Sequence, residues 1–147
     1  MPTITVVLAD DDEQVREALR LTLVADGRFT VVGVAGTGEG VRDVVASTHP
    51  DLVLMDVHMP AGGPDLCRAV SGFRDGGDPP VVVAVSADHR VTTVRSMLLA
   101  GATGYLGKGL LGEGLGDLLA ACSRGRVVLA VPHARRVFQG WGEDPTG

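Results

Sequence analysis

Side chains that together suit phosphoryl transfer follow the apolar runs of this sequence. Two adjacent carboxylates, Asp10 and Asp11, follow TVVLA, and Asp56 ends DLVLMD. Ser86 ends VVVAVS, and Lys108 follows GATGYLG. Crowded carboxylates repel one another, and a divalent cation such as Mg²⁺, which prefers oxygen ligands, relieves that repulsion. A carboxylate beside Mg²⁺ can accept a phosphoryl group whose oxygens are then held by the metal, an ammonium and a hydroxyl.

Each of these acidic and hydroxyl residues also has a simpler structural interpretation. Asp10 and Asp11 are suited to capping a following helix, because acidic residues are favoured at helix N-termini. A third acid, Asp12, exceeds what a cap requires, so we expect Asp11 to bind a metal directly, Asp10 to bind it through water and Asp12 to cap the helix. The alternatives for Asp56 and Ser86 are a turn residue and a helix cap, respectively.

Lys108 is distinguished by composition. Of the thirteen basic residues, twelve are arginine and Lys108 is the sole lysine. A compact ammonium suits a point contact to a phosphoryl oxygen and a carboxylate, whereas a planar guanidinium does not. The position of the one lysine after the fifth apolar run therefore favours a site at that point.

Short apolar runs predict the strands that position these residues, and apolar residues at helical spacing predict the helices between them. Strands are expected at Thr3–Ala9, Phe29–Ala35, Asp51–Asp56, Val81–Ser86 and Gly104–Leu106, and helices at Glu13–Asp26, Gly40–Thr48, Leu66–Phe73, Val91–Leu99 and Leu115–Ser123, with a loop at Pro60–Pro64. This alternation predicts an α/β fold, a doubly wound parallel sheet with helices on both faces. Ligands in such sheets bind at the carboxyl ends of the strands, which is where the residues named above lie.

Composition narrows the class of protein. The 147 residues fit one domain, and 45% apolar with 21% charged residues is typical of a globular chain. The net charge of −5 disfavours polyanion binding, and 3% aromatic residues disfavours base stacking. No apolar run is long enough to span a membrane, so we expect no membrane partner. Two cysteines are too few for a disulfide framework, and we expect a cytoplasmic protein.

The motifs, in this order, resemble the receiver domain of two-component response regulators. The resemblance rests on VLADDDEQVREAL, DLVLMDVHMP, the Ser86-Ala87 pair and GATGYLGKG, and it spans Ile4 to Leu129. It implies the flavodoxin-like (βα)5 fold with strand order 2-1-3-4-5. The sequence departs from the family pattern in the loop AGGPDL and at Gly109, where many relatives have proline.

The resemblance also implies roles for individual residues. Asp56 would accept a phosphoryl group from a sensor histidine kinase. The metal, Mg²⁺, would be held by Asp10, Asp11, Asp56 and the backbone carbonyl of His58. Ser86 and Lys108 would hold the phosphoryl oxygens, and Tyr105 would be the aromatic switch residue.

Phosphorylation is therefore expected to operate a switch. The phosphoryl group would draw Ser86 and Lys108 inward, and Tyr105 would fill the space that Ser86 vacates. The face made by the fourth helix, fifth strand and fifth helix would then pair with a second copy or release an effector domain. We further hypothesise that His58 and Asp88, on opposite rims of the pocket, control how long the phosphate survives.

The C-terminal part resembles one subfamily. GATGYLGK and RGRVVLAV look most like receivers of the NarL/FixJ (LuxR) type, which carry a C-terminal helix-turn-helix. We expect a receiver domain at 1–130 and a linker or tail at 131–147. No helix-turn-helix is present before Gly147, so either this is an excised receiver or the natural protein ends here. Contact with DNA, and a role in transcription, are expected only through an effector domain absent from this chain.

Two other functions remain open at this point. One is a binding module that keeps the fold without phosphorylation, against which the complete set of acids, hydroxyl and lysine argues. The other is a phosphatase with Asp56 as nucleophile, resembling the dehalogenase-like enzymes. Those enzymes have an acid two residues after the nucleophile, where this chain has His58, and a cap domain that this length excludes. We therefore do not expect an enzyme, and phosphoryl uptake that is lost in Asp56→Asn would separate the three.

Overall fold

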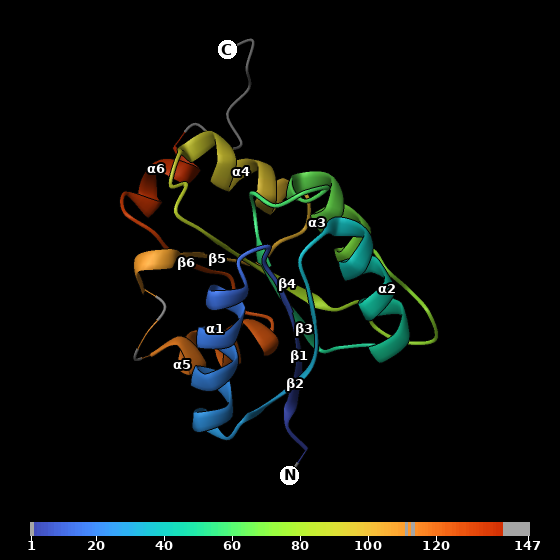
Figure 1. Ribbon diagram of the computed structural model, residues 1–147. Helices are drawn as coiled ribbons and strands as arrows, with labels where there is room; N and C mark the ends of the chain where they lie inside the picture. The colour runs from blue at the N-terminus through green and yellow to red at the C-terminus, as the bar shows by residue number, and fades with distance from the viewer. Residues whose placement is uncertain (1, 111, 113, 140–147) are drawn as a thin grey trace.

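A computed structural model describes residues 2–110, 112 and 114–139 (Figure 1). A six-stranded, all-parallel sheet has the order β2-β1-β3-β4-β5-β6. The predicted order 2-1-3-4-5 is confirmed and extended by one strand at the β5 edge. The strands are β1 (Ile4–Ala9), β2 (Phe29–Ala35), β3 (Leu52–Asp56), β4 (Val81–Ser86), β5 (Gly104–Gly107) and β6 (Val128–Ala130). The helices are α1 (Glu13–Asp26), α2 (Gly38–Thr48), α3 (Gly63–Ser71), α4 (Val91–Leu99), the 3₁₀ turn η1 (Lys108–Leu110), α5 (Leu115–Ser123) and α6 (Ala134–Phe138).

The helices cover both faces of the sheet. In Figure 1, α1 and α5 lie on one side, and α2, α3 and α4 lie on the other. Because side chains alternate along a strand, β1 contributes Val6 to the core under α1 and α5 and Val7 to the core under α2, α3 and α4. β3 is buried along its whole length. Two apolar cores therefore pack against opposite faces of the central strands and fix the positions of their carboxyl ends.

The end of the chain contains two elements that the periodicity did not predict. β6 pairs with β5 in parallel, and α6 packs against α4. β6 has only three residues, all half-buried at the sheet edge, so it lacks the long apolar run by which the other strands are recognised. The predicted tail at 131–147 thus includes a short helix, and its part at 140–147 lies outside the described residues.

Two helices begin earlier than predicted. α3 starts at Gly63, so the expectation of a loop throughout Pro60–Pro64 was wrong at its C-terminal end. Pro64 lies in the first turn of α3, where the missing N–H would have no intrahelical partner in any case. α2 starts at Gly38 rather than Gly40, because the hydroxyl of Thr37 accepts a hydrogen bond from the Gly40 amide at 3.1 Å and caps the helix.

Within the described part of the chain, no helix combines the length and the apolar character that crossing a membrane requires.

Close backbone contact at Gly38 fixes the loop that follows β3. The Gly38 amide donates a hydrogen bond to the carbonyl oxygen of Pro60 at 2.8 Å. A Cβ atom at position 38 would lie 1.9 Å from the carbonyl oxygen of Ala61, which itself has a positive φ of 56°. Only glycine allows the start of α2 to approach the loop this closely.

Replacing Gly38 by alanine is expected to destabilise the protein by about 2 kcal/mol, because the new methyl group must displace backbone rather than a flexible side chain. Urea unfolding followed by circular dichroism measures the change. Gly77→Ala is the matched control, since a Cβ atom there would meet nothing within 4 Å, and its effect should stay within about 0.5 kcal/mol. Equal stability of the two variants would contradict the proposed close contact.

Candidate functional site

Strand register brings four of the predicted site residues to one edge of the sheet. Ala9 pairs with Met55, so Asp10 and Asp56 are the next residues on neighbouring strands. Asp56 pairs with Val85, and Ser86 follows on β4. Ser86 in turn pairs with Gly107, after which Lys108 begins η1. The carboxyl ends of β1, β3, β4 and β5 therefore meet at one place.

Three carboxylates lie together at this edge. Oxygen atoms of Asp10, Asp11 and Asp56 all lie within 4.8 Å of one another. Asp10 and Asp56 are only 2% and 4% exposed, whereas Asp11 faces solvent. Burial, and next the nearby negative charge of Asp10, raise the pKa of the Asp56 carboxyl. The ionised form of Asp56 is thus held at a free-energy cost.

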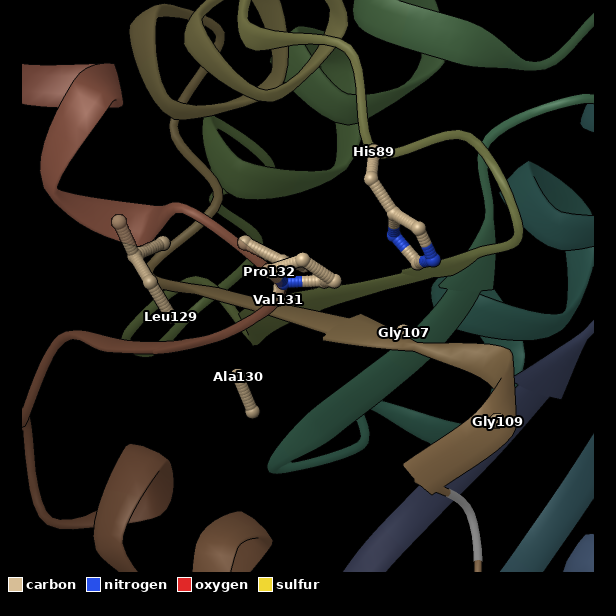
Figure 2. Close-up of a pocket in the computed structure, with 7 residues that line it drawn as sticks. All are labelled: His89, Gly107, Gly109, Leu129, Ala130, Val131 and Pro132. Carbon is tan, nitrogen blue, oxygen red and sulfur yellow. The ribbon is translucent and has the colours of Figure 1, made fainter.

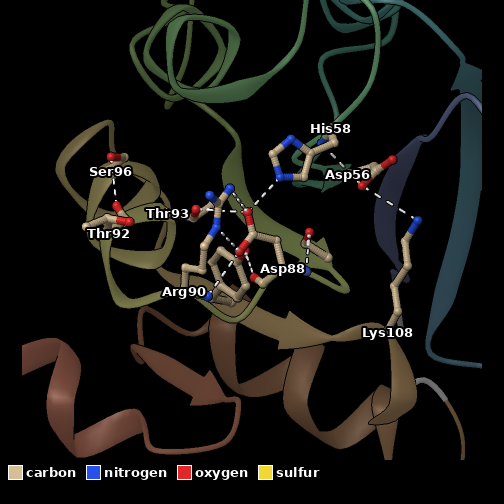
Figure 3. Close-up of polar contacts among 10 residues, drawn as sticks. Asp56, His58, Asp88, Arg90, Thr92, Thr93, Ser96 and Lys108 are labelled. Atoms are coloured by element: carbon tan, nitrogen blue, oxygen red, sulfur yellow. Dashed lines mark hydrogen bonds and ion pairs between the residues drawn. The ribbon is translucent and has the colours of Figure 1, made fainter.

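Lys108 partly offsets this crowding of negative charge. Its Nζ lies 3.2 Å from Oδ2 of Asp10 and 3.6 Å from Oδ1 of Asp56. Figure 3 shows the Lys108 side chain extending from η1 toward Asp56. Burial by itself lowers the pKa of Lys108, but the two carboxylates outweigh it and raise that pKa overall. The lysine therefore remains an ammonium.

The donor set fits a hard divalent cation. The site gathers three carboxyl groups around a single ammonium, so their ionised forms are only partly neutralised, and its ligand atoms are carboxylate oxygens, which Mg²⁺ prefers. Asp12 does not join them, because its carboxylate accepts hydrogen bonds from the amides of Gln14 (2.9 Å) and Val15 (3.3 Å). Asp12 caps α1 as predicted, and the assignment of direct metal binding to Asp11 and water-mediated binding to Asp10 stays a prediction.

Arg16 supports the site, although the sequence patterns did not indicate it. Its Nη1 donates a hydrogen bond to the backbone carbonyl of Asp10 at 2.8 Å, from α1 back to the end of β1. The Asp10 carboxylate also accepts a hydrogen bond from the Asp12 amide at 2.9 Å. Arg16 is one of twelve arginines, and nothing in its spacing distinguishes it from the others.

A polar bridge crosses one side of the site. Nε2 of His58 lies 2.8 Å from Oδ2 of Asp88, joining the β3–α3 loop to the β4–α4 loop (Figure 3). The Asp88 carboxylate also accepts hydrogen bonds from Arg90 (2.7 and 3.0 Å) and from the hydroxyl of Thr93 (2.9 Å). Arg90 above all holds the pKa of Asp88 well below its ordinary range. The backbone amide of His58 donates to Asp56 Oδ1 at 3.4 Å, so this bridge begins directly beside Asp56.

Ser86 and Tyr105 are both buried, and both contact the backbone of Asp88. The hydroxyl of Ser86 accepts a hydrogen bond from the Asp88 amide at 3.0 Å. The hydroxyl of Tyr105 donates to the Asp88 carbonyl, and burial raises the pKa of this fully enclosed phenol. The ring of Tyr105 thus already lies inside the molecule. Its role as a switch, and the roles of Ser86 and the His58 carbonyl, stay predictions.

Solved structures share this architecture. A two-component response regulator of the LuxR family from Aurantimonas sp. SI85-9A1 superposes with a TM-score of 0.82 at 25% identity, over 94% of this chain and 97% of that one. The signal receiver domain of the putative response regulator NarL from Mycobacterium tuberculosis gives a TM-score of 0.76 at 29% identity, over 86% of this chain and all of that one.

Sequence comparison leads to the same family. The chain is 33% identical over 139 residues to the uncharacterized transcriptional regulatory protein YxjL of Bacillus subtilis, covering 92% of this chain and 61% of that protein. It spans 57% and 46% of two further curated relatives, so it corresponds to about half to three fifths of their length. Residues 6–120 match the model of the response regulator receiver domain. With the carboxylate cluster and the parallel fold described above, this match shows that the chain belongs to the response regulator receiver domain family.

Proposed function

We propose that this chain is the phosphoacceptor receiver of a two-component response regulator, phosphorylated on Asp56 by a sensor histidine kinase in the presence of Mg²⁺. The observation that carries the proposal is the buried Asp56 carboxylate, which lies within 4.8 Å of two further carboxylates and 3.6 Å from the ammonium of Lys108. A carboxylate that only ended a strand would need neither the neighbouring carboxylates nor the ammonium.

The residues divide the chemistry as follows. A carboxylate oxygen of Asp56 bonds to phosphorus as the bond between phosphorus and the phosphohistidine nitrogen of the kinase breaks. Asp10, Asp11, Asp56 and the backbone carbonyl of His58 would hold Mg²⁺, which supplies positive charge against the phosphoryl oxygens. Lys108 contributes a second positive charge, and Ser86 a hydroxyl donor.

The proposed output of this receiver is a change in the shape of one face of the molecule. We propose that phosphorylation alters the face of α4, β5 and α5 and promotes pairing with a second copy. The full-length protein would act as a cytoplasmic transcriptional regulator that contacts DNA through an effector domain outside this chain. The name of the relative YxjL, a transcriptional regulatory protein, supports that output.

Acetyl phosphate with Mg²⁺ is expected to add one phosphoryl group to the purified chain, detectable by intact-mass spectrometry. Asp56→Asn should take up none, because an amide cannot form the acyl phosphate, and chelation of Mg²⁺ should strongly slow uptake by the unaltered chain. Asp65→Asn is the control, since Asp65 is an exposed carboxylate that pairs with Arg68 on α3, and it should be phosphorylated normally. Uptake by Asp56→Asn equal to that of the unaltered chain would contradict the assignment.

The raised pKa of Asp56 predicts how stability depends on pH in Mg²⁺-free buffer. The folded protein holds this proton more tightly than the unfolded chain, whose Asp pKa is about 3.9. The free energy of unfolding should therefore fall as pH rises from about 4 through the folded-state pKa. Asp56→Asn removes that penalty, so it should stabilise the protein at pH 7 and stabilise it less near pH 4. Urea unfolding at both pH values tests this, and a destabilised variant at pH 7 would refute it.

The bridge between His58 and Asp88 is expected to limit the access of water to the acyl phosphate. His58→Ala should shorten the phosphate lifetime about two- to fivefold, the effect of losing a partly exposed polar pair. The decay of the phosphorylated mass after removal of acetyl phosphate measures this lifetime. Asp75→Ala is the control, because it breaks an equivalent pair with His49 that lies away from the site. An unchanged lifetime in His58→Ala would eliminate the idea.

A further inference from the structure

One side chain of α4, that of Arg95, hydrogen-bonds to the C-terminal segment 128–139, here called the strap. Nε of Arg95 donates to the carbonyl of Val137 at 2.6 Å, and Nη2 donates to the carbonyls of Arg136, at 3.2 Å, and Gln139. The last carbonyls of a helix have no intrahelical partner and carry partial negative charge, so a guanidinium satisfies them well. Arg95 therefore acts as the C-terminal cap of α6 while belonging to α4.

The strap also contributes apolar side chains to the core around Tyr105. Val137 is 1% exposed and belongs to the same packed cluster as Tyr105 and Met97 of α4. On β6, Leu129 pairs directly with Tyr105 of β5 and packs against that cluster. Tyr105 thus lies in a core to which both α4 and the strap contribute, while its hydroxyl is held by the Asp88 carbonyl.

The strap is open on its remaining side. A cavity of about 460 Å³ separates Val131 and Pro132 from His89 and the end of β5 (Figure 2). Among the described residues, the strap is attached through the short β5–β6 pairing, through α4, and through packing of β6 against α5.

We propose that Arg95 is a positioning residue that fastens the strap over α4, and that the fastened strap keeps Tyr105 in its buried position. The phosphoryl site and the strap then restrain the same ring from two directions: Asp88 holds the hydroxyl, and the strap closes over the ring. This inference concerns the unphosphorylated chain and does not depend on the proposed phosphorylation of Asp56.

The test uses the sole tyrosine of the chain as its probe. The full chain is treated with tetranitromethane, without phosphodonor, and nitration of Tyr105 is followed by mass spectrometry. Arg95→Gln removes the guanidinium that donates three hydrogen bonds to the strap, and it should increase the nitration rate at least about tenfold, the change expected from losing even one of them. Amide hydrogen exchange in residues 128–139 should accelerate in the same variant. Arg135→Gln, at an exposed arginine of α6, is the control and should behave like the unaltered chain.

An internal control separates release of the strap from general loosening. The amides of β1 and β3, which lie at the centre of the sheet and are not paired with the strap, should exchange at an unchanged rate in Arg95→Gln. Accelerated exchange in β1 and β3 alongside faster nitration would overturn the proposal, as would an unchanged nitration rate with faster exchange in the strap. Unchanged exchange in the strap would show that Arg95 does not fasten it. If Arg95→Gln does not fold, Val137→Ala decides by the same measurements, and the same increase at Tyr105 alone is expected.

Discussion

Repulsion among carboxylates at the carboxyl edge of the sheet is the constraint on which the site depends. Asp10 and Asp56 are almost completely buried, and Asp11 brings a third charge to the same point. Left alone these groups would move apart or take up protons. They stay together because β1 and β3 are clamped between two apolar cores and because Lys108 reaches both buried acids. The folding energy of the sheet thus maintains a locally unfavourable arrangement of charges, which a bound cation would relieve.

The surroundings of Asp56 differ on its two sides. On one side, Lys108 of η1 forms an ion pair with Asp56. On the other side, His58 contacts Asp88, which accepts a hydrogen bond from Thr93 in the first turn of α4. The ion pair with Lys108 depends directly on the charge of the Asp56 carboxylate. The connection through His58 is a chain of hydrogen bonds that ends on Thr93 and, through the backbone of Asp88, on Tyr105. A change at Asp56 therefore has a short physical route to α4, the helix on which the strap is fastened.

Long, regular features of the fold could be predicted from the sequence, and contacts made by single side chains could not. The apolar runs before Asp10, Asp56 and Ser86 were enough to place parallel strands, and parallel strands bring their carboxyl ends together. By contrast, β6 is too short to show a pattern, and the start of α3 depends on how Pro64 fits a first turn. The hydrogen bonds that Arg16 and Arg95 donate to backbone carbonyls depend on tertiary approach, since the sequence places the two residues among ten other arginines.

The buried position of Tyr105 has a consequence for signalling. In this conformation the aromatic ring is already fully enclosed, so under the switch hypothesis activation would add little inward movement at this residue. The resting and stimulated populations would then share this part of their structure, and the free-energy gap between them would come from electrostatics at the acidic edge. A receiver built in this way would give some basal output without its kinase, and its dynamic range would be set by how strongly the added charge biases that equilibrium.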